Sequence, residues 1–229
     1  MVVLSVTVML TAMMFPAYAG LRRNAERVVS ASNMRQVGMA MTIYANEYGG
    51  ALPYSALARV PEGRLVQEMM ATHLGPDVTS WEDEALPLYA GHKNWEGLGN
   101  LISQAYLYSP EVLYCPAHRG DHEFSRYERQ YFEPTMVLYS NYQYRGDIDI
   151  FTGRRLTLDR DAHRVMLTDG MRTRRDFNHQ VGYNSLLGDG SVFWRFDGSG
   201  EVFNRLPEHR VDAIEAAQIY QEVWDIIDN

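Results

Sequence analysis

Two titratable residues in the C-terminal third of the chain could do acid–base or ligand chemistry. His179 is followed by nine residues and then by Asp189-Gly190. An imidazole and a carboxylate in one pocket, with His163 as a further candidate, would suit an exported or membrane-anchored hydrolase or ligand-binding module. Alternatively, His179 bonds a backbone or aspartate partner and Asp189-Gly190 makes a turn. We expect the structural role, because no third ligand or nucleophile is obvious, and we predict no catalytic residue and no enzyme activity.

A cysteine and two histidines have the types that zinc prefers. Cys115, His118 and His122 follow the spacing Cys-x2-His-x3-His. A structural zinc site closes with four ligands, so a fourth would have to come from elsewhere, for instance from His92 or Asp121. We expect instead a buried cysteine in front of a proline bend, and no zinc cofactor.

Two aspartates offer oxygen ligands for calcium. Asp189, Asp197 and the carbonyls around Gly198 and Gly200 could surround this ion, which takes hard oxygen ligands on glycine-rich loops. Aspartate and glycine populate plain turns equally well. Calcium is therefore an alternative to a metal-free turn, and we predict no cofactor.

An antiparallel sheet must position these residues. Asp-Gly between two apolar runs is a strong hairpin signal, which predicts strands over 183–187 and 191–196. Further strands are expected over 135–144 and 164–168. Helical spacing predicts short helices over 64–73 and 97–107 and a closing helix from 207 onward. The expected fold class is α+β: a long N-terminal helix on a small antiparallel sheet, with short accessory helices and a C-terminal helix.

The N-terminal region predicts one helix of two characters. No charged side chain precedes Arg22, and an apolar run of this length can cross a hydrocarbon core of about 30 Å. Behind it, apolar residues recur at helical spacing until two glycines and Pro53 end the pattern. We expect a helix from about residue 2 to 47, about 70 Å long, transmembrane over 1–21 and amphipathic over 22–48. Pro16 should kink it.

A cleaved signal peptide is the alternative interpretation of the apolar run. Ala17-Tyr18-Ala19 is an acceptable small-x-small cleavage site. However, no basic residue precedes the run, Arg22 and Arg23 follow it at once, and the helical pattern continues across the cut. A helix buried in a soluble core is a third reading. We expect an uncleaved anchor.

Composition and charge restrict the partners and the number of domains. The chain has 229 residues, 46% of them hydrophobic, and a net charge of −8. Nucleic-acid binding needs clustered cations, so we expect no nucleic-acid partner. One cysteine cannot form an internal disulfide. The residues behind the helix, 53–229, suit one compact head domain.

Several short motifs occur in one order over most of the chain. They are Asn33 to Gly38 and Tyr44-Ala45-Asn46, then Gly50 to Pro53, then Leu113-Tyr114-Cys115-Pro116, then Ser140 to Gly146, and finally His179, Gly182, Asp189 and Gly190. Together they resemble the bacterial type IV pilin-like proteins, specifically the pseudopilin-like family with the prepilin-type processing-associated His-X9-Asp-Gly motif.

The resemblance implies a structural subunit. Such a protein is expected in the bacterial inner membrane as a single-pass protein with a periplasmic head, and to assemble through its N-terminal helix with copies of itself or with other pseudopilins. The product would be a pilus- or type II secretion-like filament. The family's basic leader, cleavage point and early glutamate would lie upstream of Met1. If such a leader exists, the resemblance implies cleavage by a prepilin peptidase and N-methylation. Related major pseudopilins bind calcium in a C-terminal loop.

Overall fold

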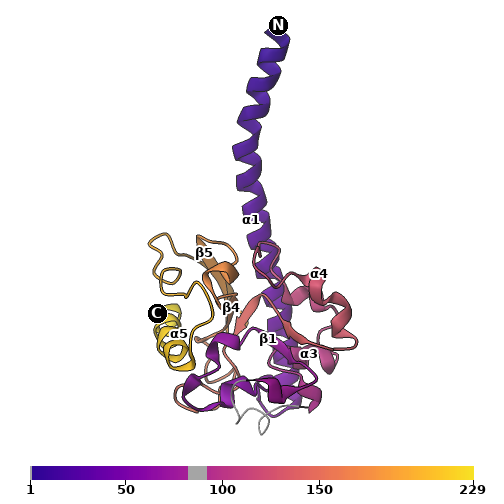
Figure 1. Ribbon diagram of the computed structural model, residues 1–229, viewed down its shortest axis with the longest axis vertical. Coiled ribbons are helices and arrows are strands. Elements are labelled where there is room, and N and C mark those ends of the chain that lie inside the picture. The colour runs from indigo at the N-terminus through magenta and orange to yellow at the C-terminus, as the bar shows by residue number, and fades with distance from the viewer. Residues whose placement is uncertain (1, 82–91) are drawn as a thin grey trace.

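The computed structural model describes the backbone of residues 2–81 and 92–229 and the side chains of residues 18–79, 81 and 93–229. Helices and antiparallel sheets are both present, which confirms the expected α+β class. One long helix extends out of a head that the rest of the chain forms (Figure 1).

The long helix α1 runs over Val2–Glu47. Its back half buries one apolar side against the head: Met34, Val37, Met41 and Tyr44. The helix ends where Gly49 and Gly50 take φ values of 61° and 83°, which residues with a side chain rarely adopt. The Gly50 amide donates a hydrogen bond of 2.7 Å to the Ala45 carbonyl and so satisfies one of the last free carbonyls.

The expected single-pass location in the inner membrane is wrong on this structure. Within the part of the chain that the structure describes, no helix is both long enough and apolar enough to cross a bilayer. The described part of α1 carries Arg22, Arg23 and Arg27 within two turns, and charged side chains are costly in hydrocarbon. The predicted transmembrane stretch 1–21 lies, up to residue 17, outside the described side chains, and so does the predicted kink at Pro16.

The described part of the head contains two antiparallel sheets. The smaller pairs β1 (Ala71–Leu74) with β2 (Val137–Tyr139). The larger has the strand order β3-β4-β5-β6. Its strands are β3 (Tyr142–Tyr144), β4 (Val165–Asp169), β5 (Gly182–Leu187) and β6 (Val192–Phe196).

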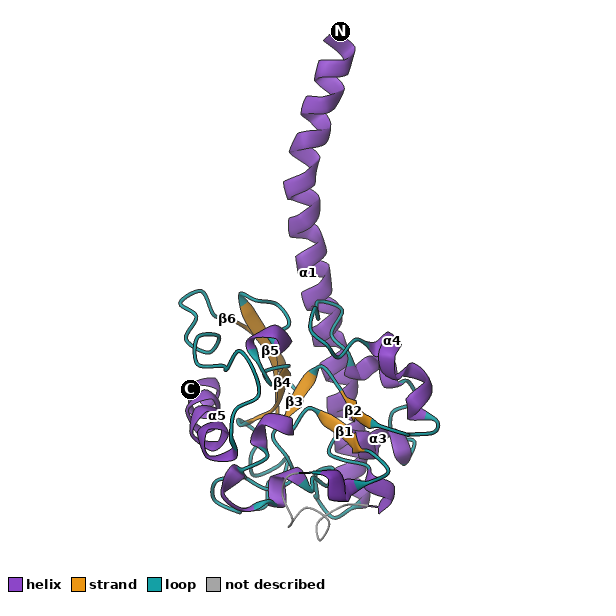
Figure 2. Cartoon of the chain, in the orientation of Figure 1, coloured by secondary structure: helices purple, strands orange, loops and turns teal. Residues whose placement is uncertain are grey.

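The larger sheet lies between two helices, α1 and the C-terminal α5 (Ala213–Asp228) (Figure 2). Because side chains alternate along a strand, β5 and β6 offer one face to each helix. On the α1 face, the Asn184 side chain donates to the Arg27 carbonyl. On the opposite face, Arg195 donates a 2.7 Å bond to the Ile226 carbonyl of α5. The sheet thus links α1, the shaft that extends from the head, to the C-terminal helix α5.

Several predicted elements are confirmed and several are wrong. The hairpin of β5 and β6 matches the expected arms, and α5 matches the closing helix, begun by the Asp212 side chain that accepts from two amides of the first turn. The expected helix over 64–73 is instead a turn followed by β1. The expected strand over 135–144 is divided into β2 and β3, which belong to different sheets, and the helix over 97–107 shortens to α3 (Gly99–Ser103).

Short elements make up much of the remaining head. They are α4 (Phe124–Tyr127) and the 3-10 turns η1 (Leu57–Arg59), η2 (Pro61–Gly63), η3 (Val66–Glu68), η4 (Val78–Ser80), η5 (His92–Asn94), η6 (Pro110–Leu113), η7 (Glu128–Tyr131) and η8 (Arg174–Asp176).

Candidate functional site

Three side chains from separate segments converge beside α1: Cys115, Asp169 and His179. Cys115 follows η6, Asp169 ends β4, and His179 precedes β5. The His179 Nε2 atom lies 3.4 Å from the Cys115 sulfur and 3.4 Å from Asp169 Oδ2. All three ligand atoms lie within 4.8 Å of one another. We call this group the Cys-Asp-His cluster.

Hydrogen bonds fix the carboxylate of the cluster. Asp169 is fully buried. Its Oδ1 atom accepts from the Ser30 hydroxyl of α1 at 2.9 Å and from the Asn178 amide at 3.2 Å. Its Oδ2 atom accepts from the Asn184 backbone at 2.6 Å. Both carboxylate oxygens of Asp169 therefore accept hydrogen bonds, and one of the donors, Ser30, belongs to α1.

The imidazole of the cluster is held by its loop and by a ring contact. His179 meets Trp194 edge to face, with ring centroids 5.2 Å apart. Gln180, the next residue, has a φ of 62°, an uncommon conformation for a residue with a side chain. Gly182 then lets β6 approach, because a Cβ there would lie 2.3 Å from the Arg195 carbonyl. The loop between η8 and β5 thus aims His179 at the cluster.

The cluster does not have the arrangement of a cysteine nucleophile and its base. Such a site needs the thiol at one ring nitrogen and the orienting carboxylate at the other. Here Cys115 and Asp169 both lie against Nε2 of His179. Burial, together with the nearby Asp169 charge, raises the pKa of the Cys115 thiol well above its usual value, so the sulfur keeps its proton. The three atoms converge on one point, as ligands do.

His179 and Asp189 do not meet. They flank the six residues of β5, which span about 17 Å at roughly 3.3 Å per residue. Asp189 sits in the β5–β6 turn, where Gly190 has a φ of 84°. Its carboxylate accepts from the Ser191 amide at 2.8 Å, and bonding to Ser191 lowers the pKa of Asp189. His163 lies near Asp189, at the end of β5 that is remote from the Cys-Asp-His cluster. The turn role is confirmed, and His179 and Asp189, on which the hydrolase alternative was centred, lie at opposite ends of β5.

The predicted zinc set is divided between two places. Cys115 contacts His179, whereas His118 Nδ1 lies 2.7 Å from the Asn178 side-chain oxygen. His122 Nδ1 lies 2.8 Å from the Tyr127 hydroxyl. Each of these histidines therefore has a neutral partner of its own.

The two histidines are buried and uncharged. Burial lowers the pKa of His118, and it lowers the pKa of His122 to about 4. At neutral pH both rings serve as hydrogen-bonding groups of the core. The suggested fourth ligand His92 lies outside the described side chains.

The predicted calcium pair is also divided. Asp189 lies before β6 and Asp197 lies after it. The Asp197 carboxylate accepts from the backbone amides of Val202 and Phe203 at 3.1 and 2.8 Å. It therefore stabilises the loop behind β6 and does not share an oxygen cage with Asp189.

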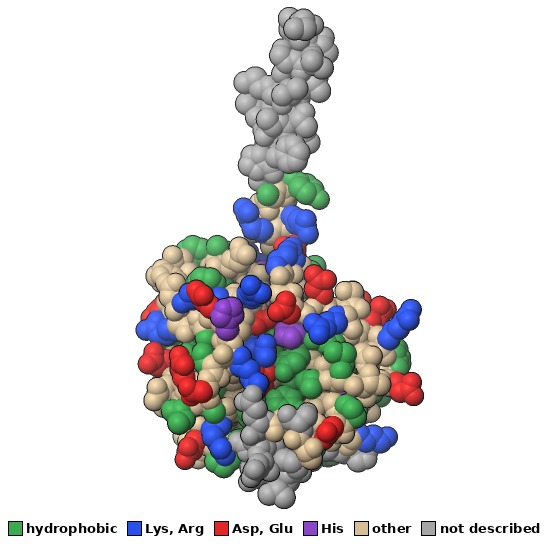
Figure 3. Space-filling model, viewed as in Figure 1, with side chains coloured by type: hydrophobic (Ala, Val, Ile, Leu, Met, Phe, Trp, Pro, Cys, Tyr) green, Lys and Arg blue, Asp and Glu red, His purple; other side chains and the backbone are tan. Residues whose placement is uncertain are grey.

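A second feature is an apolar stripe on the shaft, away from the head. Among the described side chains of α1, Tyr18 and four large non-aromatic apolar ones are half or more exposed; the four are Leu21, Val28, Met39 and Ile43. At about 100° per residue they fall within an arc of roughly 60°, on the side of the helix opposite the buried Met34-to-Tyr44 set. We call these four residues the α1 apolar face. Basic side chains gather where the shaft leaves the head (Figure 3).

Comparison with protein-family models, with curated proteins and with solved structures finds no match for this chain. Its resemblance to pilin-like proteins therefore rests on the motifs in the sequence.

Proposed function

We propose that this protein is a non-enzymatic, pseudopilin-like structural subunit that assembles with copies of itself through α1 into a pilus- or type II secretion-like filament. The observation that carries the proposal is the α1 apolar face. One apolar side of α1 is sufficient to pack against the head, so a second, exposed apolar side is not explained by the fold. Exposed apolar stripes at helical spacing mark association surfaces.

The spacing of the α1 apolar face suits helix–helix packing. Leu21 and Val28 are seven residues apart, and Met39 and Ile43 are four apart. Both separations return a side chain to nearly the same side of a helix, so neighbouring helices could interlock along the whole shaft.

Charge favours a second copy of this chain as the partner. α1 carries four arginines and two glutamates, whereas the residues behind it hold 27 of the 29 acidic side chains and 17 of the 21 basic ones. Staggered copies would bring the basic shaft of one subunit against the acidic head of the next. Such complementarity orients association and steers it.

The length of α1 also suits a subunit that assembles through this helix. α1 extends well beyond the head that covers its back half (Figure 1). The order of the sequence motifs, from the helix exit to His179 and Asp189-Gly190, adds the family resemblance as support.

Charges placed on the α1 apolar face should block assembly. We expect the double substitution Val28→Glu and Met39→Glu to raise the concentration needed for half-assembly by roughly 100-fold, because two carboxylates would have to leave water at the interface. Both side chains are exposed, so the fold should keep its stability within about 0.5 kcal/mol. Sedimentation velocity over a concentration series and electron microscopy measure the assembly.

The matched control is Ile214→Glu. Ile214 is 68% exposed and also lies on a helix, but on α5. This variant should assemble as the wild type does. A wild-type chain that stays monomeric at every concentration, or a double variant that still assembles normally, would refute the proposal.

A further inference from the structure

We propose that Cys115, Asp169 and His179 bind a divalent metal ion of the zinc type at the junction of the shaft and the head. The ligands are a thiolate, a carboxylate oxygen and an imidazole nitrogen, all of which zinc accepts in proteins. They come from three segments that are 54 and 10 residues apart along the chain.

Two of the three distances between the ligand atoms are close to those of a tetrahedral site. With bonds of about 2.3 Å to sulfur and about 2.0 to 2.2 Å to nitrogen and oxygen, a tetrahedral ion separates sulfur from nitrogen by about 3.6 Å and nitrogen from oxygen by about 3.4 Å. The structure places both pairs at 3.4 Å. The third pair, the Cys115 sulfur and the Asp169 oxygen, lies within 4.8 Å, a limit that includes the tetrahedral separation of about 3.6 Å.

His179 has two partners at a single ring nitrogen. The Nε2 atom of a neutral histidine has either one proton or one lone pair, so it can serve only one of its two neighbours. The 3.4 Å separation between His179 Nε2 and Asp169 Oδ2 is also longer than an ordinary hydrogen bond between nitrogen and oxygen. A cation between the three atoms would satisfy all of them at once.

The burial of the Asp169 carboxylate also favours a bound cation. Its carboxylate is fully buried, and among the described residues its one ion-pair contact is with His179, which is charged only when protonated. An unpaired buried carboxylate costs several kcal/mol. Meanwhile Ser30, Asn178 and the Asn184 amide orient its two oxygens, as partners behind metal ligands do.

Two surface cavities approach the cluster. One, of about 470 Å³, is lined by Cys115 together with Asn33 of α1. The other, also about 470 Å³, is lined by His179 and Trp194. Solvent from either cavity could fill the fourth coordination position, and the thiol proton of Cys115 would leave to solvent when the ion binds.

The ion would tie the head together next to the shaft. It would join the loop after η6, the end of β4 and the loop before β5, while Ser30 connects Asp169 to α1. Metal loading should therefore raise the thermal midpoint of the full chain, because the ion binds the folded state alone.

Cobalt can report this site directly. Cys115 is the only cysteine, so a thiolate-to-cobalt charge-transfer band in the full-length, untagged protein would identify its sulfur as a ligand without any variant. We expect the metal-free protein to bind one equivalent of Co²⁺ with this band, and added Zn²⁺ to displace it. We also expect Cys115→Ser to abolish the band, and His179→Gln to weaken zinc affinity, measured by chelator competition, by at least about 100-fold.

The control is His163→Gln, which removes an exposed histidine near Asp189 and should leave the band and the affinity unchanged. If a ligand variant fails to fold, the wild-type band and the zinc-dependent rise in the thermal midpoint still decide the matter. Absence of the band in the wild-type protein, or unchanged zinc affinity in a folded His179→Gln variant, would overturn the proposal. Filament assembly is measured separately, so either proposal can fail alone.

Discussion

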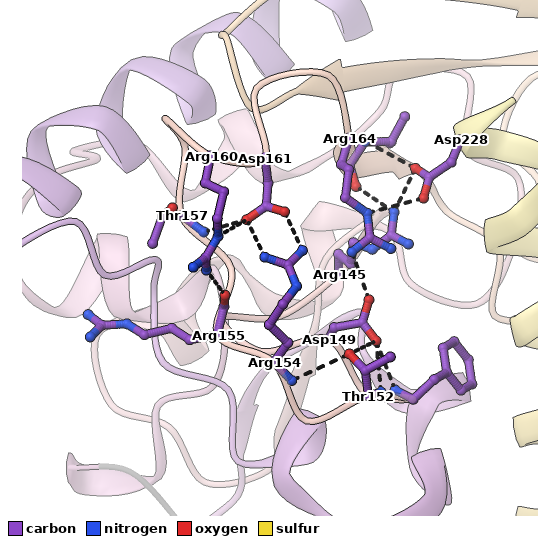
Figure 4. A network of polar contacts seen from close by, with 12 residues as sticks. Arg145, Asp149, Thr152, Arg154, Arg155, Thr157, Arg160, Asp161, Arg164 and Asp228 are labelled. Atoms are coloured by element: carbon purple, nitrogen blue, oxygen red, sulfur yellow. Dashed lines mark hydrogen bonds and ion pairs between the residues drawn. The ribbon is translucent and has the colours of Figure 1, made fainter.

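Replacing Asp228 by alanine is expected to lower the free energy of unfolding by about 3 kcal/mol. Asp228 ends α5 and accepts a 2.7 Å bond from Arg145, whose side chain is only 4% exposed. It also accepts from Arg164 and from the Val165 amide of β4 (Figure 4). Without this carboxylate, the charge of Arg145 would remain buried and lose its ion-pair partner.

Chemical denaturation of the purified chain measures this effect, and the thermal midpoint should fall by roughly 10 °C. Asp225→Ala is the matched control, because Asp225 lies one turn earlier on α5 and is exposed. It should change the free energy by less than about 0.5 kcal/mol. Adding Arg145→Met to Asp228→Ala should recover part of the loss, since the buried charge is then gone. Equal stability of the two alanine variants would contradict this account.

Raising the pH should destabilise the protein through Glu96. This residue is 1% exposed, and burial raises the pKa of its carboxyl to about 8, with the neighbouring charge of Asp147 adding to the effect. Between pH 4.5 and 8, the folded chain holds a proton that the unfolded chain has released. Stability therefore falls as the pH rises through this range, by a few kcal/mol in total, since each pKa unit is about 1.4 kcal/mol.

Glu96→Gln tests the assignment, because an amide has the shape of the protonated acid but does not ionise. The Ser55 hydroxyl and the Ala56 amide now donate to the two oxygens of Glu96, and a glutamine can keep a bond to each. The variant should match the wild type near pH 5 and exceed its stability at pH 8.5 in urea titrations. Glu111→Gln, at an exposed carboxyl, should follow the wild-type pH profile. A Glu96→Gln variant that loses stability with pH as steeply as the wild type would show that another group titrates.

Local signals in the sequence predicted the elements whose causes are local. Asp189-Gly190 predicted the hairpin because the φ of 84° at Gly190 comes at no cost to glycine. The apolar residues at helical spacing after Asp212 predicted α5 correctly. The stretch 64–73 was misassigned because its apolar residues fit a helix and a buried strand equally well, and pairing with β2 decided between them.

The two faces of α1 show where periodicity reaches its limit. The apolar period of 22–48 predicted an amphipathic helix, and one stripe was assigned to it. Val28 is one of the apolar residues of that stretch, yet it is 61% exposed. The head covers only one side of the shaft, and helical spacing does not say which of two apolar sides it covers.

By itself, the sequence determined the α+β class, the long N-terminal helix, the β5–β6 hairpin and the closing helix, because each of these depends on the order of neighbouring side chains and on turn chemistry. Only the tertiary structure decided the partners of the reactive groups. His179 precedes β5 and Asp189 follows it, so the strand separates the two residues. The antiparallel pairing of β4 with β5 brings His179 next to Asp169 instead. Contacts between segments distant in the chain are set by sheet register and by packing on α1, and no spacing in a single sequence encodes them.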